Sequence, residues 1–204
     1  MGEFIYNEET RIHTLDGKVI PSVSNIVEPL SMDYSKAHPG KLARKKDLGI
    51  AFHECIRLFL MNDLDEDSID EELVIPIRQF EEFWRKDEFV VRPFPTLIAI
   101  EHPYCNEKLK YCGKPDLITI DAIYDWKLRK YDPICDPLRM AGYAGLVSDF
   151  PRKRKVVVEF SLDCGYRVHD AEKKQAWPMF RKLLDWYWKK QEFENLCEKW
   201  RKQW

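Results

Sequence analysis

Three strand-like runs stand close together between residues 96 and 129, and segments with helical spacing lie on both sides of them. The runs read TLIAIEHPYC, LKYCGKPDLITI and AIYDWKLR, and short polar turns separate them. Apolar runs joined by such turns are typical of an antiparallel meander. Helices before and after a small sheet cover its faces and bury its apolar side chains. The order of elements therefore predicts an α/β fold, with a mixed β-sheet flanked by α-helices.

The segment before these runs is predicted to form a hairpin and then helices. The hairpin is centred on Asp16-Gly17, a strong turn dipeptide, and Ser22 or Ser24 can cap the short helix that follows. A long helix is predicted over residues 41–62, and a second helix follows an acidic linker. The apolar positions that indicate these two helices recur every three or four residues: Leu48, Phe52, Cys55 and Phe59, then Leu73, Ile77, Phe80 and Trp84.

The segment after the strand-like runs predicts a helix in DPLRMAGYAGLVSDF, a hairpin in RKVVVEFSLDCGYRVHD and a long C-terminal helical region. The chain has 204 residues, enough for one α/β domain with a real core and too few for two comfortable domains. We therefore expect a single domain over residues 1–204. It divides into a hairpin and helices (1–95), the sheet and the following helix (96–160), and a hairpin end with C-terminal helices (161–204).

Composition limits the classes of partner. The chain carries 33 Lys and Arg residues and 35 Asp and Glu residues, a formal net charge of −2. Any contact with nucleic acid must therefore come from local basic patches. The six cysteines are scattered without a C-x-x-C pair, and no apolar run is long enough to span a bilayer. We expect reduced thiols in a cytoplasmic protein that does not contact a membrane.

Four charged residues are predicted to approach one another at one end of this sheet. A strand alternates its side chains, so Asp125 and Lys127 share a face while Trp126 points into the opposite packing layer. Pairing of the last two strands makes a close approach of Asp116 to Asp125 feasible, and Glu101 ends the strand before them. The alternative is that these are ordinary hairpin charges that face solvent.

Three neighbouring carboxylates cannot all stay ionised without a cation. Hard oxygen ligands that leave room for water and phosphate suit Mg²⁺ or Mn²⁺. A lysine ammonium beside them can contact an attacking water, or the charge that develops on a transferring phosphate. The combination predicts metal-assisted hydrolysis of phosphodiester bonds.

These residues resemble the signature of the PD-(D/E)xK nuclease superfamily. The residues that match the signature are Glu101, Gly113-Lys-Pro-Asp116 and Asp125-Trp-Lys127. Within the superfamily they most resemble the RecB-like branch, which includes phage exonucleases and the mitochondrial genome-maintenance exonuclease. Gly49-Ile-Ala-Phe-His53 resembles the branch's helix with a metal-facing histidine, and Arg139-Met-Ala-Gly-Tyr143 resembles its Q-x-x-x-Y helix. The resemblance implies a restriction-endonuclease-like core and covers nearly the whole chain.

The resemblance also implies a set of metal ligands. Asp116 and Asp125 would be the principal ligands, assisted by the backbone carbonyl of Trp126. His53 would complete the first metal shell through a ring nitrogen, although a histidine beside an apolar stripe is more often a core or surface residue. Glu101 would hold a second metal or orient a water.

Further residues are implied in catalysis and substrate binding. Lys127 would position or activate the nucleophilic water, and Tyr143 would contact the substrate near the scissile phosphate. Arg139 stands where the family usually has glutamine, so it would either grip a phosphate or form a salt bridge to a site carboxylate. Two basic clusters near the expected site are further candidates for substrate contacts, with solvated faces as the alternative; they include Arg44 and Lys45, and Arg129 and Lys130.

The expected function is a divalent-metal-dependent DNA exonuclease that acts on single-stranded or duplex ends. No ATP-binding motif is present, so a helicase or recombination partner would be a separate protein. The setting would be the cytoplasm of a bacterial or phage-infected cell, in recombination, replication or DNA degradation. Two alternatives stay open: a DNA-binding subunit with little catalysis, and a structure-specific endonuclease with the same chemistry.

Overall fold

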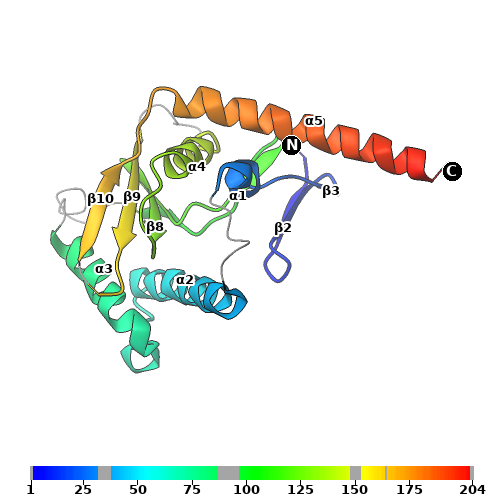
Figure 1. Ribbon diagram of the computed structural model, residues 1–204. Helices are drawn as coiled ribbons and strands as arrows, with labels where there is room; N and C mark the ends of the chain where they lie inside the picture. The colour runs from blue at the N-terminus through cyan, green and yellow to red at the C-terminus, as the bar shows by residue number, and fades with distance from the viewer. Residues whose placement is uncertain (1, 32–37, 87–96, 148–152, 164, 203–204) are drawn as a thin grey trace.

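The computed structural model describes residues 2–31, 38–86, 97–147, 153–163 and 165–202. Its centre is a five-stranded sheet with the strand order β10-β9-β8-β7-β4 (Figure 1). The strands are β4 (Leu97–Ile100), β7 (Leu117–Thr119), β8 (Ala122–Lys127), β9 (Arg154–Phe160) and β10 (Tyr166–Asp170). β8 and β9 pair in parallel, whereas the other neighbours pair antiparallel. The predicted mixed sheet is confirmed.

Helices cover both faces of this sheet (Figure 1). α2 (Pro39–Leu60) and α3 (Val74–Lys86) pack on one face, in a cluster that includes the side chains of Tyr124 and Trp126. α1 (Val23–Val27), α4 (Cys135–Ala144) and α5 (Ala176–Arg201) pack on the other face, in a cluster that includes Ile123. Adjacent residues of β8 thus enter different layers, as strand alternation predicts. The α/β class is confirmed.

The N-terminal segment forms a small sheet of its own, with the order β1-β2-β3. Its strands are β1 (Phe4–Asn7), β2 (Ile12–Leu15) and β3 (Lys18–Val19). Asp16 and Gly17 have φ values of 50° and 71°, and this left-handed pair suits the tight β2–β3 turn. Ser22 caps α1, because its hydroxyl accepts a bond from the Asn25 N–H. The predicted turn and cap are confirmed, and β1 is an additional strand.

The antiparallel meander predicted between residues 96 and 129 is confirmed for β4, β7 and β8, which come from the three runs and pair in that order, but an additional hairpin interrupts it. β4 pairs with β7, while β5 (Tyr104–Asn106) and β6 (Tyr111–Gly113) form a separate two-stranded sheet. The run LKYCGKPDLITI is therefore divided between β6 and β7 at Pro115, a residue that cannot donate a backbone hydrogen bond. As a result Asp116, the residue before β7, lies beside the end of β4, and its carbonyl accepts a 3.0 Å bond from the Glu101 N–H.

The first long helix is close to its prediction, since α2 spans residues 39–60 rather than 41–62. Its fully buried stripe consists of Leu48, Phe52 and Ile56, whereas Cys55 and Phe59 are only half-buried. Within the described residues, 3₁₀ turns also occur at Glu28–Leu30, Glu66–Ser68 and Glu71–Leu73. None of the described helices combines the length and the apolar character that a membrane-spanning segment requires. The five described cysteines are free thiols.

Candidate metal centre

Three elements that are distant in the sequence meet at one end of the central sheet. α2 contributes His53, Glu101 follows β4, and Asp116 precedes β7. One ligand atom from each of these side chains lies within 4.8 Å of those of the other two. Metal–ligand bonds of about 2.0–2.6 Å require ligand atoms within about 5 Å of one another. These three side chains could therefore hold one metal ion.

Asp116 is the centre of this cluster. One carboxylate oxygen, Oδ1, lies 3.2 Å from His53 Nδ1, and the other, Oδ2, accepts a 2.6 Å bond from the Trp126 N–H. Burial alone would raise the pKa of Asp116, but the charges of His53 and Lys127 outweigh it, so the pKa is lowered. Burial alone would lower the pKa of His53, and the charge of Asp116 outweighs that as well. Asp116 is consequently held ionised and aimed into the cluster.

Glu101 is held in an uncommon backbone conformation. Its φ is 42°, in the left-handed region that costs a residue with a side chain on the order of 1 kcal/mol or more. The bond from its N–H to the Asp116 carbonyl stabilises this conformation. Its carboxylate Oε2 lies 2.6 Å from the Lys114 ammonium, a partner that the sequence did not indicate. Glu101 thus faces the cluster with its charge balanced by a neighbouring lysine.

Asp125 and Lys127 form a pair beside the cluster. Lys127 Nζ lies 2.6 Å from Asp125 Oδ2, and Asp125 is 1% exposed. Burial raises the pKa of Asp125, the positive charge of Lys127 partly offsets this, and the negative charge of Asp116 raises the pKa further. Among the described residues, however, the cluster of metal-ligating atoms does not include Asp125. The structure brings Asp116 together with His53 and Glu101, and sets Asp125 against Lys127.

The indole of Trp126 lies in the opposite layer, as predicted. Its ring packs against Phe80 and Phe83, with centroid distances of 5.4 and 5.9 Å. Only its backbone faces the site, where the N–H binds Asp116. Coordination of a metal by the Trp126 carbonyl stays a prediction.

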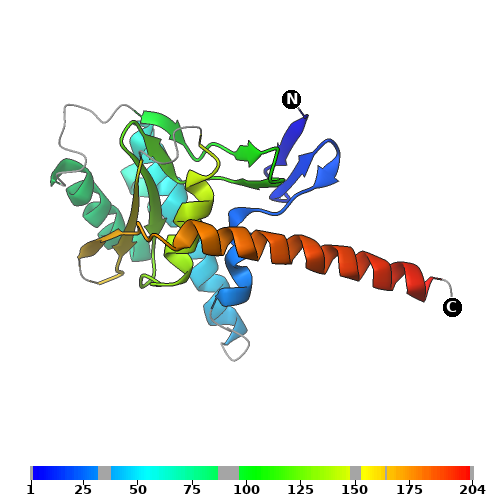
Figure 2. The same cartoon turned by 90° about the horizontal axis from the view of Figure 1, so that it is seen from above.

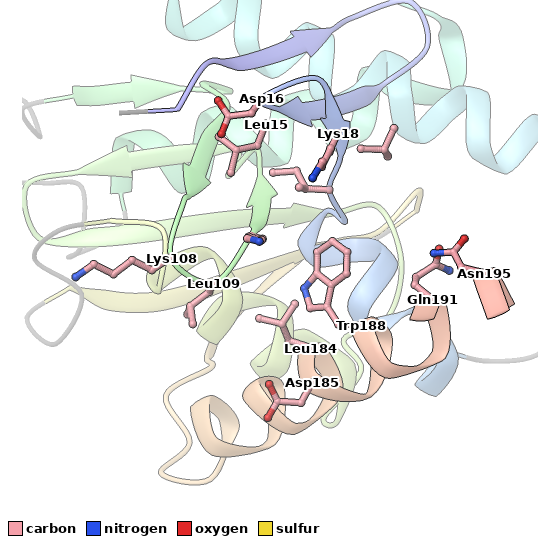
Figure 3. Close-up of a pocket in the computed structure, with 13 residues that line it drawn as sticks. Leu15, Asp16, Lys18, Lys108, Leu109, Leu184, Asp185, Trp188, Gln191 and Asn195 are labelled. Atoms are coloured by element: carbon pink, nitrogen blue, oxygen red, sulfur yellow. The ribbon is translucent and has the colours of Figure 1, made fainter. Parts of the chain in front are cut away.

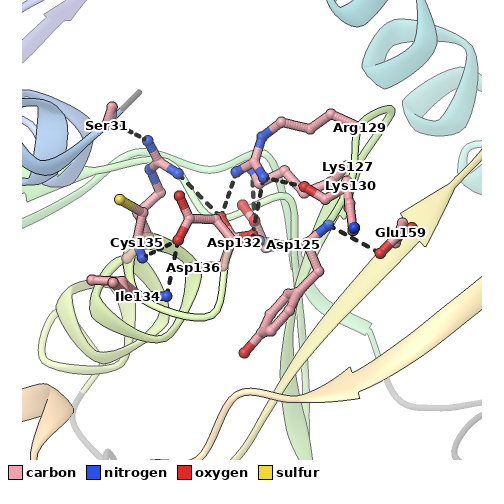
Figure 4. A network of polar contacts seen from close by, with 12 residues as sticks. Ser31, Asp125, Lys127, Arg129, Lys130, Asp132, Ile134, Cys135, Asp136 and Glu159 are labelled. Carbon is pink, nitrogen blue, oxygen red and sulfur yellow. Dashed lines mark hydrogen bonds and ion pairs between the residues drawn. The ribbon is translucent and has the colours of Figure 1, made fainter. Parts of the chain in front are cut away.

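Two of the three arginines proposed as substrate contacts, Arg129 and Arg139, bind a carboxylate that the sequence did not single out; Figure 4 shows Arg129 against it. Asp136 of α4 is completely buried and pairs with Arg129. Arg139 Nη1 lies 3.1 Å from the same carboxylate, and its Nη2 lies 3.2 Å from Ser31 Oγ. Arg139 therefore forms a salt bridge to a carboxylate, though not to a member of the metal cluster. Arg139 follows Asp136 by three residues on the same helix, and this spacing was the sequence signal that could have predicted their salt bridge.

Tyr143 lies beneath the site rather than at its surface. It is 8% exposed, and its ring is so close to Gly113 that a Cβ there would lie 3.0 Å from it. Burial raises the pKa of Tyr143, and the charges of Asp125 and Asp116 raise it further. The hydroxyl is therefore protonated, and a substrate contact would require the ring to become accessible.

The cluster opens into a groove of about 890 Å³. The β1–β2 hairpin forms one wall with Tyr6, Glu8 and Arg11, and α2 forms the other. Its described lining carries four basic side chains, Arg11, Lys46, Arg57 and Lys114, and four acidic ones, Glu8, Glu54, Glu101 and Asp116. The residues of α2 that line the groove recur every three or four positions. This helical spacing is the sequence signal that could have distinguished Lys46, which lines the groove, from its neighbours, which do not.

The two residues predicted from the first basic cluster lie outside this lining. Arg44 points to the far side of α2, where its Nη2 lies 2.9 Å from Asp70 and 2.5 Å from Glu72. Lys45 is exposed and does not line the groove. Lys130 is exposed beside a different hollow, at the end of β8.

A further hollow of about 640 Å³ lies between β2–β3, the β5–β6 turn and α5 (Figure 3). Its lining includes Leu15, Leu184 and Trp188, and Lys18, Lys108 and Lys110. In the described part of the chain its acidic lining consists of Asp16 and Asp185, and no histidine, cysteine or glutamate accompanies them. The hollow therefore offers no group of metal ligands comparable to the groove.

The donor set of the groove is one imidazole and two carboxylates. Hard oxygen donors with one nitrogen suit Mg²⁺, Mn²⁺ and related divalent ions, and three protein ligands leave positions for water and a substrate oxygen. Comparisons of the chain with models of protein families and with curated proteins found no match, so no relative's activity bears on this site.

Proposed function

We propose that this protein is a divalent-metal-dependent DNA exonuclease with a restriction-endonuclease-like core. The observation that supports it most is the meeting of His53, Glu101 and Asp116 in a groove that also carries four basic side chains. Acidic metal ligands with basic side chains beside them suit a phosphodiester substrate, because a bound metal would face the phosphate while the basic side chains would hold the flanking backbone. Mg²⁺ or Mn²⁺ is the proposed cofactor.

His53, Glu101 and Asp116 would hold the ion. When bound, it would lower the pKa of a coordinated water and neutralise charge on the phosphate. Asp125 sets the position of Lys127 through their 2.6 Å ion pair. The Lys127 ammonium can then orient a water for attack, or stabilise the charge that develops on the phosphate oxygens.

The separation of Asp125 from the ligand cluster favours a second candidate, a nucleic-acid-binding subunit that binds metal without efficient cleavage. The two candidate functions differ only in whether the protein cleaves the DNA that it binds. DNA that is bound in the groove but stays intact with Mg²⁺ and with Mn²⁺ would select the second.

The proposed function is tested by incubating the protein with Mg²⁺ and linear DNA labelled at either end, beside closed circular single-stranded DNA. We expect release of short products from the linear DNA and intact circles, with no cleavage in excess chelator. Cleavage of circles would show an endonuclease. No cleavage of any substrate would contradict the enzyme proposal.

Replacement of Lys114 by methionine is expected to tighten Mn²⁺ binding by roughly three- to tenfold. The Lys114 ammonium occupies Glu101 Oε2 at 2.6 Å, so it competes with a cation for the same carboxylate. Isothermal titration calorimetry measures this without any substrate. Lys110→Met is the matched control, because Lys110 lies outside the groove. Weaker Mn²⁺ binding in Lys114→Met would show that the lysine supports the site instead.

Replacement of Lys46 by alanine is expected to weaken DNA binding by roughly three- to tenfold and to lower the slope of log K against log salt by about 1. Lys46 lines the groove, while the adjacent Lys45 does not. Lys45→Ala should therefore change affinity less than about twofold. Fluorescence anisotropy with labelled DNA in Ca²⁺, over a range of salt concentrations, measures both. Equal losses in the two variants would place the DNA elsewhere.

A further inference from the structure

The second half of α5 extends beyond the rest of the molecule (Figures 1 and 2). Ala176, Phe180 and Leu184 in the first half are buried against α1 and α4. From residue 189 to residue 202 no side chain is buried. A helical segment of this length is marginal alone in water, and its stability here comes from the docked half.

This projecting half carries three large apolar side chains on one face. Phe193, Leu196 and Trp200 are 66%, 50% and 70% exposed, and their spacing of three and four residues aligns them along the helix. Trp186, 46% exposed, continues the same stripe one heptad earlier. The stripe is separate from the face of α5 that lines the hollow in Figure 3. A stripe at heptad spacing is the pattern with which one helix packs on another.

We propose that a second copy of this chain covers the stripe, through antiparallel pairing of the two α5 helices over residues 189–201. Charge complementarity identifies the occupant. In the register that places Phe193 opposite Leu196 of the second copy, Trp200 lies opposite its Lys189. Glu192 and Lys199 of the second copy flank the seam between these two layers and come close to each other. Among the described residues, Lys190 and Glu194 form the ion pair of this half, which leaves Glu192 and Lys199 available. Each copy contributes both members of every contact, as a two-fold interface requires.

Parallel pairing fits the same residues poorly. It would place Lys189 against Lys189 in the seam, where like charges repel. It would also bring the two globular parts to the same end of the helix pair. The antiparallel arrangement sends them to opposite ends, and no residue of α5 is among those that line the metal groove. The dimer therefore leaves the groove open and does not depend on the proposed nuclease activity.

The expected dimer is weak. Three large apolar side chains per copy bury less than the roughly 800 Å² per partner of a standard interface. We therefore expect a dissociation constant in the micromolar range and a monomer–dimer equilibrium that depends on concentration.

Sedimentation equilibrium of the full chain between about 5 and 500 µM measures this directly. Phe193→Glu should raise the dissociation constant at least about tenfold, because it places a charge in the seam. Ile120→Glu is the matched control, because Ile120 is 57% exposed in the turn between β7 and β8, and it should leave the constant unchanged. A wild-type chain that stays monomeric at 500 µM, or a dimer that Phe193→Glu does not weaken, would overturn the proposal.

Charge reversal tests the antiparallel register. Glu192→Lys and Lys199→Glu should each weaken the dimer at least about fivefold, because each brings like charges close to one another. The double variant restores opposite charges across the interface and should recover the wild-type constant within about threefold. A double variant as weak as the single ones would show that these residues do not face each other and would overturn the proposed pairing.

Discussion

Replacement of Asp116 by asparagine is expected to lower the affinity for Mn²⁺ at least about 100-fold and to lower kcat on DNA about 1,000-fold or more. The Asp116 carboxylate contacts both His53, at 3.2 Å, and the Trp126 N–H, at 2.6 Å. An asparagine keeps the size and an acceptor for that N–H, but removes the negative charge that a divalent cation requires. Calorimetry with Mn²⁺ and single-turnover cleavage measure the two losses separately.

The matched control for this variant is Asp121→Asn. Asp121 is exposed in the turn between β7 and β8, and its described hydrogen bond is made by its carbonyl. It should bind metal and cleave DNA like the wild type. Thermal unfolding should show both variants folded at the assay temperature. An Asp116→Asn variant that binds Mn²⁺ with wild-type affinity would place the cation elsewhere.

Replacement of Lys127 by methionine is expected to lower kcat about 100- to 10,000-fold while Mn²⁺ affinity changes less than about threefold. The ammonium lies against Asp125, outside the three-ligand cluster, so its loss should affect the chemical step rather than metal binding. Asp125 is 1% exposed and would lose its partner, and its raised pKa allows it to take up a proton instead. The Lys127→Met variant should therefore lower the rate of cleavage without weakening the binding of Mn²⁺.

Lys127→Arg distinguishes charge from geometry. An arginine keeps the positive charge, but its planar guanidinium is larger and cannot place one compact donor at the same point. We expect it to recover less than about a tenth of the lost kcat, with KM for DNA close to the wild-type value. A Lys127→Met variant with more than about a tenth of the wild-type kcat would remove Lys127 from the mechanism.

The parts of the fold that follow from local patterns could be predicted from the sequence. Side-chain alternation separates Trp126 from Asp125 and Lys127, and it does so in the structure. Helical spacing located α2 within two residues at either end. The Asp16-Gly17 turn and the Ser22 cap follow from backbone conformations that few other residues favour.

The separate hairpin of β5 and β6 could not be predicted in the same way. Local patterns assign LKYCGKPDLITI to one strand, whereas in the folded chain its two halves enter different sheets. The pairing of β4 with β7 is what brings Glu101 beside Asp116. The sequence therefore indicated the acidic residues, but not which of them share a ligand cluster.

Local sequence patterns also could not predict which charged side chains pair with one another. Arg139 and Arg129 were candidates for phosphate contacts, yet the buried Asp136 binds both. The position of Lys114 between Gly113 and Pro115 indicates no partner for it, yet its ammonium pairs with Glu101. Such choices depend on which opposite charge is desolvated nearby, and that is a property of the folded chain.

Anomalous diffraction from crystals grown with Mn²⁺ tests the central claim most directly. We predict one manganese peak about 2.0–2.4 Å from a ring nitrogen of His53 and from carboxylate oxygens of Glu101 and Asp116. The Asp116→Asn crystal should lack that peak under the same conditions. Manganese that binds only at other positions, with these three side chains left paired as they are here, would contradict the account.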